Sequence, residues 1–179
     1  MSNPSPLSEA HDRIVRGYLV AKDHQRPHHM PAVFAEDARF VSHIDFDPAL
    51  DDVAEGCAAI TEVFRRLGAQ GESITTLYLS DTLRHADDGL HFRWVVAVSD
   101  RASGIPWVAW GDYAWQFAPD GDRATSLEVW MSHREVLTAE VEVFPRLWSL
   151  AEPWCTRDTL ATVLPPVREL DGLRAWLRS

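Results

Sequence analysis

A change in hydrophobic period near residue 70 constrains the fold of this chain more than any other feature. Before it, apolar residues recur at helical spacing, and from residue 73 onward apolar and polar residues alternate through four long runs. Helical spacing predicts amphipathic helices, and alternation predicts strands with one buried face. Helices followed by a run of antiparallel strands are typical of an α+β domain in which the helices cover one face of a curved sheet.

Three helices are expected before the change of period. Residues 8–24 predict a helix capped by Ser8, with an apolar stripe made of Ile14, Val15, Tyr18, Leu19 and Ala21. A second, short helix is expected over "MPAVFAED", with Pro27 or Pro31 in its first turn, where a proline is tolerated. After the strand "ARFVSHI" and the acidic loop "DFDPALDDVAE", a third helix over "CAAITEVFRRLG" should end at Gly68 and bury Ile60, Val63, Phe64 and Leu67.

Four runs of alternating residues predict the strands. They are "SITTLYLSDTLRHA", "LHFRWVVAVSD", "PWVAWGDYAWQFA" and "RATSLEVWMSHREV", with turn sequences such as "RASG" and "PDGD" between them. Side chains two residues apart share a face of a strand, and we expect Trp94 and Trp110 on the face that the helices cover. Aromatic side chains there either fill a core or line a pocket for an apolar small molecule, and the pattern leaves both open.

Residues 139–179 differ from residues 1–138 and are interpreted as a helical C-terminal extension of the α+β domain. Prolines alternate there with short amphipathic pieces, of which one is expected to be capped by Thr156 and the last to follow Pro165 and Pro166. The last piece carries its apolar residues on one side, at Val167, Leu170, Leu173, Trp176 and Leu177. This stripe must be buried on the main domain or on a second subunit.

The charge and the polar residues exclude several classes of function. The net charge is −10, whereas a protein that binds nucleic acid normally presents a basic face to the phosphates. No apolar run is long enough to span a bilayer, and "MSNPSPLSEAHDR" does not form a secretory signal, so we expect a cytoplasmic protein without a membrane partner. Cys57 and Cys155 sit in no metal-binding spacing, and a proline interrupts His24, His28 and His29, so no metal site is predicted.

Several stretches resemble a known superfamily. "GYLVAKD", "VFAEDARF", "EGCAAITEVFRRLG" and "FAPDGDRATSLEVWMSH" are similar to the nuclear-transport-factor-two-like proteins, and within them to the SnoaL-like branch near polyketide cyclases, ketosteroid isomerases and dehydratases. The resemblance covers roughly residues 8–137 and leaves the extension unexplained. It implies a cone-shaped, cystatin-like α+β fold around an interior cavity, and a homodimer formed through the sheet. Because the superfamily includes several enzyme classes and non-enzymes, the resemblance does not fix the function.

The catalytic residues of these relatives are only partly present. The ketosteroid isomerases combine a tyrosine on the first helix with a carboxylate base and a second acid; Tyr18 matches the tyrosine, but Ser42 and Trp110 stand at the other two positions. The dehydratases use an aspartate at the end of the first helix and a histidine on a strand; Asp23 matches the aspartate, but Leu77 stands at the histidine position. The resemblance therefore implies an incomplete catalytic set.

Other groups that can exchange a proton lie on the predicted strands. Asp112 shares a face with Trp110, and pairing through the "PDGD" turn would place it near Met131 on the cavity side. His133 shares a face with Met131, whereas His43 should point away from the cavity unless a bulge redirects it. A carboxylate beside an apolar cavity has a raised pKa because burial disfavours its charged form, which suits a general base.

Two functions remain open from the sequence. The first is a cofactor-independent enzyme of the isomerase, dehydratase or cyclase type, which moves a proton on an apolar, aromatic or polyketide-like substrate in an interior pocket. Its catalytic candidates are Asp23, Asp112, Tyr18, His133 and His43, and its substrate-binding candidates are Trp94, Trp110, Met131 and Phe34. The second is a non-catalytic protein of the same fold that binds small molecules or serves in assembly. The incomplete catalytic sets favour the second function, whereas the presence of Tyr18, Asp23 and Asp112 in an interior rich in tryptophan favours the enzyme, which we prefer.

Overall fold

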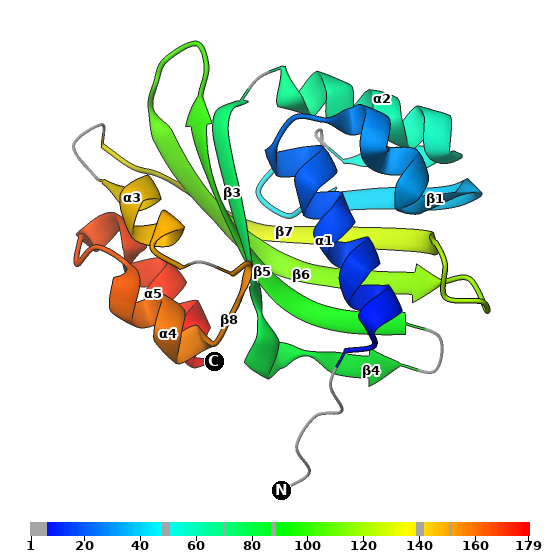
Figure 1. Ribbon diagram of the computed structural model, residues 1–179. Coiled ribbons are helices and arrows are strands. Elements are labelled where there is room, and N and C mark those ends of the chain that lie inside the picture. Colours follow the sequence, from blue (N-terminus) through cyan, green and yellow to red (C-terminus); the bar gives the residue numbers. More distant parts are fainter. Residues whose placement is uncertain (1–6, 48–50, 70, 87–88, 139–141, 151) are drawn as a thin grey trace, which may run out of the picture.

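The structure is a computed structural model that describes residues 7–47, 51–69, 71–86, 89–138, 142–150 and 152–179. One curved sheet runs through this part of the chain (Figure 1). Its strands in this part of the chain are β1 (Phe34–Ile44), β2 (Asp52–Glu55), β3 (Gly71–Leu79), β4 (Arg84–Ala86), β5 (Gly89–Asp100), β6 (Pro106–Phe117), β7 (Ala124–Val136) and β8 (Trp154–Cys155). They follow the order β2-β1-β7-β6-β5-β3-β8, and β4 pairs with β5. The predicted α+β class with a curved sheet is confirmed, and the sheet is open rather than closed into a barrel.

Two of the strand pairs differ from the expected antiparallel arrangement. β1 runs parallel to β7, and β8 runs parallel to β3, whereas β3, β5, β6 and β7 form an antiparallel run. A hairpin forces neighbouring strands to be antiparallel, but β1 reaches β7 only after a long connection, which permits parallel pairing. β2 also forms within the segment expected as an acidic loop, of which residues 48–50 lie outside the described part.

The helices α1 (Glu9–Asp23) and α2 (Cys57–Gly68) cover one face of the sheet (Figure 1). Ser8 caps α1 as expected, since its hydroxyl accepts a hydrogen bond of 3.1 Å from the backbone N–H of His11. The whole predicted stripe of α1 is buried. In α2, however, the expected burial of Leu67 is wrong: this side chain is 49% exposed. None of the described helices is long and apolar enough to cross a membrane.

The expected helix over "MPAVFAED" is misplaced. The helical turn there is the 3₁₀ helix η1 (Pro27–Ala32), with Pro27 at its start, and β1 already begins at Phe34. Pro27 lacks the N–H that a helix interior needs, which is harmless in a first turn. The alternation of buried and exposed side chains from Phe34 onward therefore belongs to a strand that is longer than the sequence suggested.

The C-terminal extension packs against the opposite face of the sheet (Figure 1). It contains the helices α3 (Val143–Trp148), α4 (Arg157–Val163) and α5 (Asp171–Arg178) and the 3₁₀ turn η4 (Arg168–Leu170). Its apolar side chains form a second core with sheet residues on that face, namely Leu77, Leu79, Val95, Ala97, Val108 and Trp110. β5 and β6 are consequently buried on both faces. The boundary expected after residue 138 adjoins residues 139–141, which lie outside the described part.

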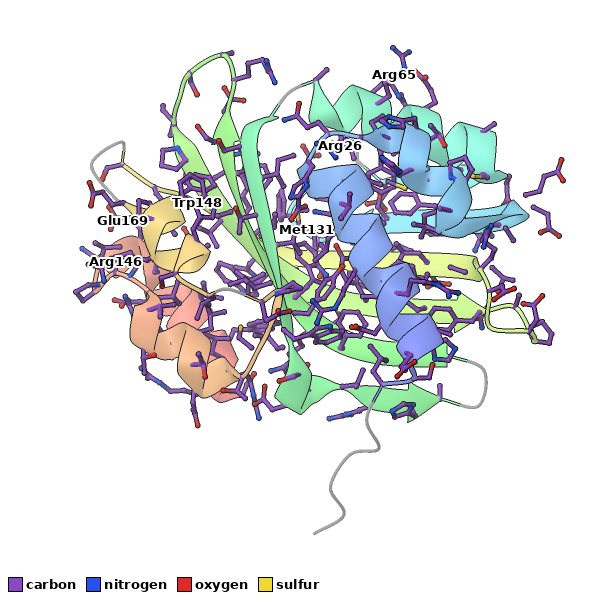
Figure 2. All side chains as sticks on the ribbon, viewed as in Figure 1. Arg26, Arg65, Met131, Arg146, Trp148 and Glu169 are labelled. Atoms are coloured by element: carbon purple, nitrogen blue, oxygen red, sulfur yellow. The ribbon has the colours of Figure 1, made fainter. Side chains whose placement is uncertain are left out.

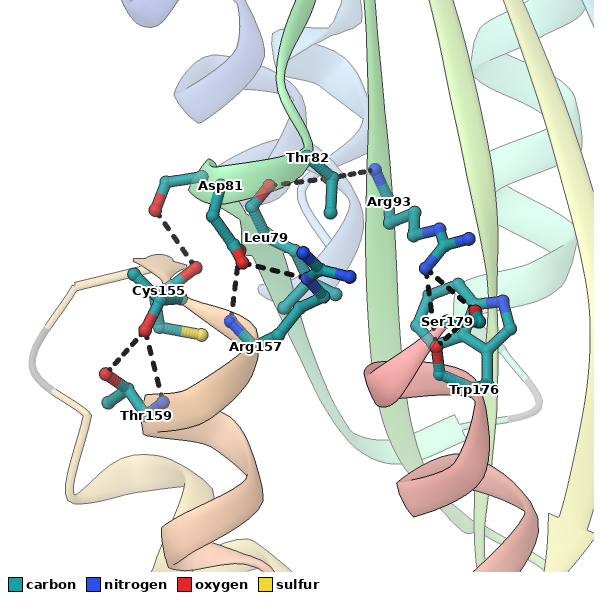
Figure 3. A network of polar contacts seen from close by, with 11 residues as sticks. Leu79, Asp81, Thr82, Arg93, Cys155, Arg157, Thr159, Trp176 and Ser179 are labelled. Atoms are coloured by element: carbon teal, nitrogen blue, oxygen red, sulfur yellow. Dashed lines mark hydrogen bonds and ion pairs between the residues drawn. The ribbon is translucent and has the colours of Figure 1, made fainter. Parts of the chain in front are cut away.

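Polar contacts orient the extension on the sheet, as Figure 3 shows. Asp81 accepts two hydrogen bonds from Arg157, at 3.0 Å from the backbone N–H and at 2.8 Å from Nε. Arg93 Nη1 donates to the carbonyl oxygen of Trp176 at 3.3 Å, and its guanidinium lies 4.7 Å from the centre of that indole ring. Because exposed ion pairs add little stability, the apolar contacts supply most of the stabilisation and these polar contacts set the register.

Candidate functional site

A cavity of about 500 Å³ lies between α1, α2 and the sheet. Most of its walls are aromatic and aliphatic side chains, including Phe40, Phe64, Trp94, Val129 and Met131. Met131, which Figure 2 labels, lies on β7. Pockets for small molecules usually measure roughly 300–1,000 Å³ and carry mostly apolar walls with a few polar groups. In size and lining this cavity is suited to a small apolar molecule.

Two buried tyrosines supply hydroxyl groups to the cavity. Tyr18 on α1 is 1% exposed and Tyr113 on β6 is 2% exposed, and their rings meet edge to face with centroids 6.0 Å apart. Burial raises the pKa of both phenols above the ordinary value, and the negative charge of nearby Asp23 adds to the effect. Both hydroxyls are therefore protonated at neutral pH, and one of them can donate to an oxygen of a ligand.

Trp94 on β5 belongs to the same wall. Its indole ring stacks on the ring of Tyr113, with centroids 5.1 Å apart and planes 17° from parallel. The side chain is 2% exposed, and among the described residues nothing accepts a hydrogen bond from its Nε1. Buried N–H groups are nearly always paired, because an unpaired one loses the hydrogen bond it made with water. The Nε1 of Trp115, which is not part of the cavity wall, is unpaired in the same way within the described part of the chain, so an unpaired indole N–H does not by itself mark a ligand site.

A lysine and an aspartate lie side by side at the end of α1. Lys22 lines the cavity with its side chain 14% exposed, and its ammonium group lies 5.8 Å from the centre of the Tyr18 ring. The ammonium binds the carboxylate of Asp23 and donates to Thr76 Oγ1 at 2.6 Å. Asp23 also accepts from the Thr76 backbone N–H at 2.7 Å and from its hydroxyl at 3.0 Å. These donors occupy the carboxylate, which holds Lys22 in place and is not itself part of the cavity wall.

Charged side chains line the exposed part of the cavity. Arg66 Nη2 lies 3.4 Å from Asp52 Oδ2, and both side chains are more than a third exposed. Hydrogen bonds from Ser103 lower the pKa of Asp100, and the positive charge of Arg134 lowers it further. A carboxylate with a lowered pKa is a weak base, so Asp100 is not suited to proton abstraction. In the described part of the chain, no three His, Cys, Asp or Glu side chains are grouped to hold a metal ion.

Solved structures share this architecture, although no family model and no curated protein sequence matches the chain. One is a hypothetical protein with a ketosteroid isomerase-like fold from Catenulispora acidiphila, in complex with trimethylamine (17% identity, 74% of this chain and 89% of that chain, TM-score 0.55). Another is an NTF2-like protein of unknown function from Burkholderia pseudomallei (17% identity, 75% of this chain and 95% of that chain, TM-score 0.55). This chain has the NTF2-like fold. A candidate isomerase of the SnoaL-like family from Agrobacterium tumefaciens also matches (18% identity, 70% of this chain and 100% of that chain, TM-score 0.52). At such low sequence identities the likeness shows the fold alone.

Three predicted site residues lie on the far side of the NTF2-like sheet from the cavity. Trp110 packs into the second core, under the extension, and stacks on His133 with ring centroids 5.4 Å apart. Asp112 shares the strand face of Trp110; burial raises its pKa, while the positive charge of Arg93 opposes that shift. The expectation that Trp110 and Asp112 face the cavity is wrong. Alternation correctly placed them on one face, but that face is the one that the extension covers.

A β-bulge in β7 explains the position of His133. Trp110 pairs with His133, yet the next residue of β6, Gly111, pairs with Met131, so Ser132 is an extra residue in β7. The bulge reverses the alternation beyond it, and therefore Met131 lines the cavity while His133 points toward the extension. The expectation that His133 shares the face of Met131 is wrong for this reason.

The other predicted residues are distributed over both faces. Tyr18, Trp94 and Met131 line the cavity, which is the position that their predicted catalytic or substrate-binding roles require. Phe34 is buried against Tyr18, with ring centroids 6.3 Å apart, but is not part of the cavity wall. His43 points away from the cavity, as alternation predicted, and lies against Trp130 on the outer face at a centroid distance of 5.3 Å. The catalytic and binding roles assigned to these residues stay predictions.

Sequence reasoning missed Tyr113 and Lys22. On β6 the odd positions carry four aromatic residues, Trp107, Tyr113, Trp115 and Phe117, whereas Trp110 is the single aromatic residue at an even position. The larger aromatic set faces the helices, and counting both sets would have identified the inner face. Lys22 is the only lysine of the chain, but a single residue type carries no spacing signal.

Proposed function

We propose that the protein binds an apolar small molecule in the cavity, with one oxygen of the ligand held by the tyrosine pair Tyr18–Tyr113. The observation that carries this proposal is a cavity of about 500 Å³ with apolar walls and two buried, protonated phenols. Apolar walls bind the body of a ligand through area removed from water, and a few polar groups fix its orientation.

The charges around the cavity favour a ligand without a net charge. The ammonium of Lys22 is compensated by Asp23, and Arg66 lies beside Asp52. Asp100 lies within the field of Arg134. A charged ligand would lose its hydration in an apolar cavity without meeting an uncompensated opposite charge, which is unfavourable. A neutral ketone, ester or phenol avoids this cost and still offers an oxygen.

A second candidate function is an isomerase-type proton transfer without a cofactor. The observation that favours it is the ammonium of Lys22, which lines the cavity beside the ring of Tyr18 and is held by Asp23. Hydroxyl donors at a carbonyl oxygen and the positive charge of the Lys22 ammonium would stabilise an enolate, while a water or hydroxide from solvent takes the proton from the adjacent carbon. Candidate isomerases among the structures of this fold are consistent with this chemistry.

Binding can be tested with β-tetralone, a bicyclic ketone, titrated into the protein while tryptophan fluorescence or heat is recorded. We expect Tyr113→Phe to weaken binding about three- to tenfold, because one hydrogen bond to the ligand is lost. Tyr78→Phe is the matched control, since Tyr78 is equally buried but is not part of the cavity wall. An equal loss in both variants, or no binding by the unaltered protein, contradicts the proposal.

Proton transfer is tested with the same ketone in deuterated water. An enolising site should exchange the hydrogens beside the carbonyl faster than buffer does, which proton NMR follows directly. Lys22→Met should remove that acceleration while β-tetralone still binds. Exchange at the buffer rate with a saturated site would eliminate the enzyme and leave the binding protein.

A further inference from the structure

Two large apolar side chains of the cavity wall are open to solvent. Phe46 is 41% exposed and Leu67 is 49% exposed, although both line the cavity. Phe64 and Trp94 of the same wall are buried. Single apolar residues on a protein surface are common and need no explanation. Phe46 and Leu67 differ from the other large exposed apolar residues of the described chain, because none of the others, for example Val53, belongs to the cavity wall.

Both residues stand where the cavity opens to solvent. Leu67 lies one turn after Val63 on α2, and both line the cavity because helical spacing places them on one face. The neighbouring Arg66 contacts Asp52 at 3.4 Å, and Asp52 begins β2, which pairs with β1. Phe46 follows the end of β1. The contact therefore joins the last turn of α2 to the ends of β1 and β2, and Leu67 and Phe46 share one opening.

The tyrosine pair lies in the buried part of the same cavity. Tyr18 and Tyr113 are almost fully buried, so the oxygen of a ligand held there is remote from solvent. At the opening, by contrast, apolar surface of Phe46 and Leu67 stays in contact with water. Covering such surface with another apolar group stabilises a complex in proportion to the area removed from water. A ligand that extends from the tyrosine pair to the opening gains this stabilisation, and a shorter one does not.

We propose that the ligand is an elongated molecule whose outer, apolar part lies across Phe46 and Leu67 while its oxygen stays at the tyrosine pair. This inference rests on the proposed function and narrows its ligand to neutral compounds that carry an apolar chain remote from the oxygen. Such a ligand enters the cavity with its oxygen first. The occupant of the opening is the ligand rather than a second protein, because the exposed apolar surface is continuous with the cavity wall.

The experiment compares β-tetralone with a derivative that carries a hexyl chain on the aromatic ring, at the end remote from the carbonyl group. Each methylene removed from water strengthens binding about fourfold, so the chain should raise the affinity at least about tenfold. Leu67→Ser and Phe46→Ser should each reduce the affinity for the hexyl compound about three- to tenfold relative to that for β-tetralone. Val53→Ser is the matched control, since Val53 is 55% exposed and is not part of the cavity wall, and it should leave the ratio of the two affinities unchanged.

The two compounds separate this inference from the proposed function. If β-tetralone binds but the hexyl chain adds no affinity, or if Val53→Ser lowers the ratio of affinities as much as Leu67→Ser does, the inference is overturned while the proposed function stands. If neither compound binds the unaltered protein, both are overturned.

The other occupant of an exposed apolar surface is a second copy of the chain, and light scattering without ligand tests for it. We expect the unaltered protein and Leu67→Ser to have the same molar mass. If the unaltered protein self-associates and Leu67→Ser abolishes this association, a second copy covers the opening and the inference is overturned.

Discussion

Gly111→Ala tests whether the bulge of β7 depends on a residue without a side chain in β6. A Cβ atom at this position would lie 1.7 Å from the carbonyl oxygen of Trp130 and 3.2 Å from the Cα of Met131. Both are backbone atoms of the neighbouring strand, so no side chain can rotate away. To restore an ordinary contact, β6 and β7 must move apart by about 1.5 Å.

The expected loss of stability follows from that displacement. Two ladder hydrogen bonds beside the bulge would be weakened or broken, at about 0.5–1.5 kcal/mol each, and forcing extra volume into a packed region adds about 1–3 kcal/mol. The free energy of unfolding should therefore fall by about 2–6 kcal/mol, which corresponds to a decrease in Tm on the order of 10 °C for a chain of this size. The cavity should change as well, because the bulge directs Met131 into it.

Urea denaturation followed by tryptophan fluorescence measures this loss. Gly17→Ala is the matched control, because the same added methyl group in α1 would approach only Val33 Cγ2, at 3.4 Å. Alanine is the better helix former, so this variant should gain about 0.5–1 kcal/mol of stability. If Gly111→Ala instead unfolds within about 1 kcal/mol of the unaltered protein, the close approach of the two strands is not a constraint and the reasoning is refuted.

Three further outcomes are expected. All three tyrosines are buried with raised pKa values, so above about pH 10 the unfolded state loses protons that the folded state keeps; stability should fall with rising pH, and phenolate absorbance should appear only as the near-ultraviolet circular dichroism is lost. Asp112→Asn should leave the affinity for β-tetralone unchanged in calorimetric titrations, and a clear decrease would place this carboxyl at the ligand after all. Leu173→Ala, at a fully buried position of α5, should cost about 2–5 kcal/mol in urea denaturation, far more than Leu67→Ala at the exposed end of α2, and equal losses would contradict the second core.

Local chemistry was sufficient for most of the elements. The hydroxyl of Ser8 and the spacing of the apolar residues behind it predict α1, because a cap and a stripe are both properties of a few consecutive residues. The same holds for α2, for the cap of α4 at Thr156 and for β5, β6 and β7, whose long runs of β-branched and aromatic residues between turn sequences predict strands. The predicted strand is shorter than β1, because the first residues of β1 follow a proline-containing helical turn and include the charged Glu36 and Asp37.

The site depended on information that no local pattern contains. Val95 and Val96 are both buried, since α1 and α2 cover one face of β5 and the extension covers the other. A strand buried on both faces loses the contrast that identifies its inner side. Alternation therefore grouped Trp110 with Asp112, but it could not tell which core they face.

The sequence by itself determined the α+β class, the helices α1 and α2, the long strands β5, β6 and β7 and the aromatic character of the interior, whereas it misplaced the helical turn before β1 and missed β2 and β8. Only the tertiary structure decided that Tyr113 and Lys22 belong to the cavity and that Asp112 and His133 do not. The physical reason is that period and capping act over a few residues, whereas the face of a strand depends on what packs against it from far along the chain and on a single bulge in β7 that reverses the alternation.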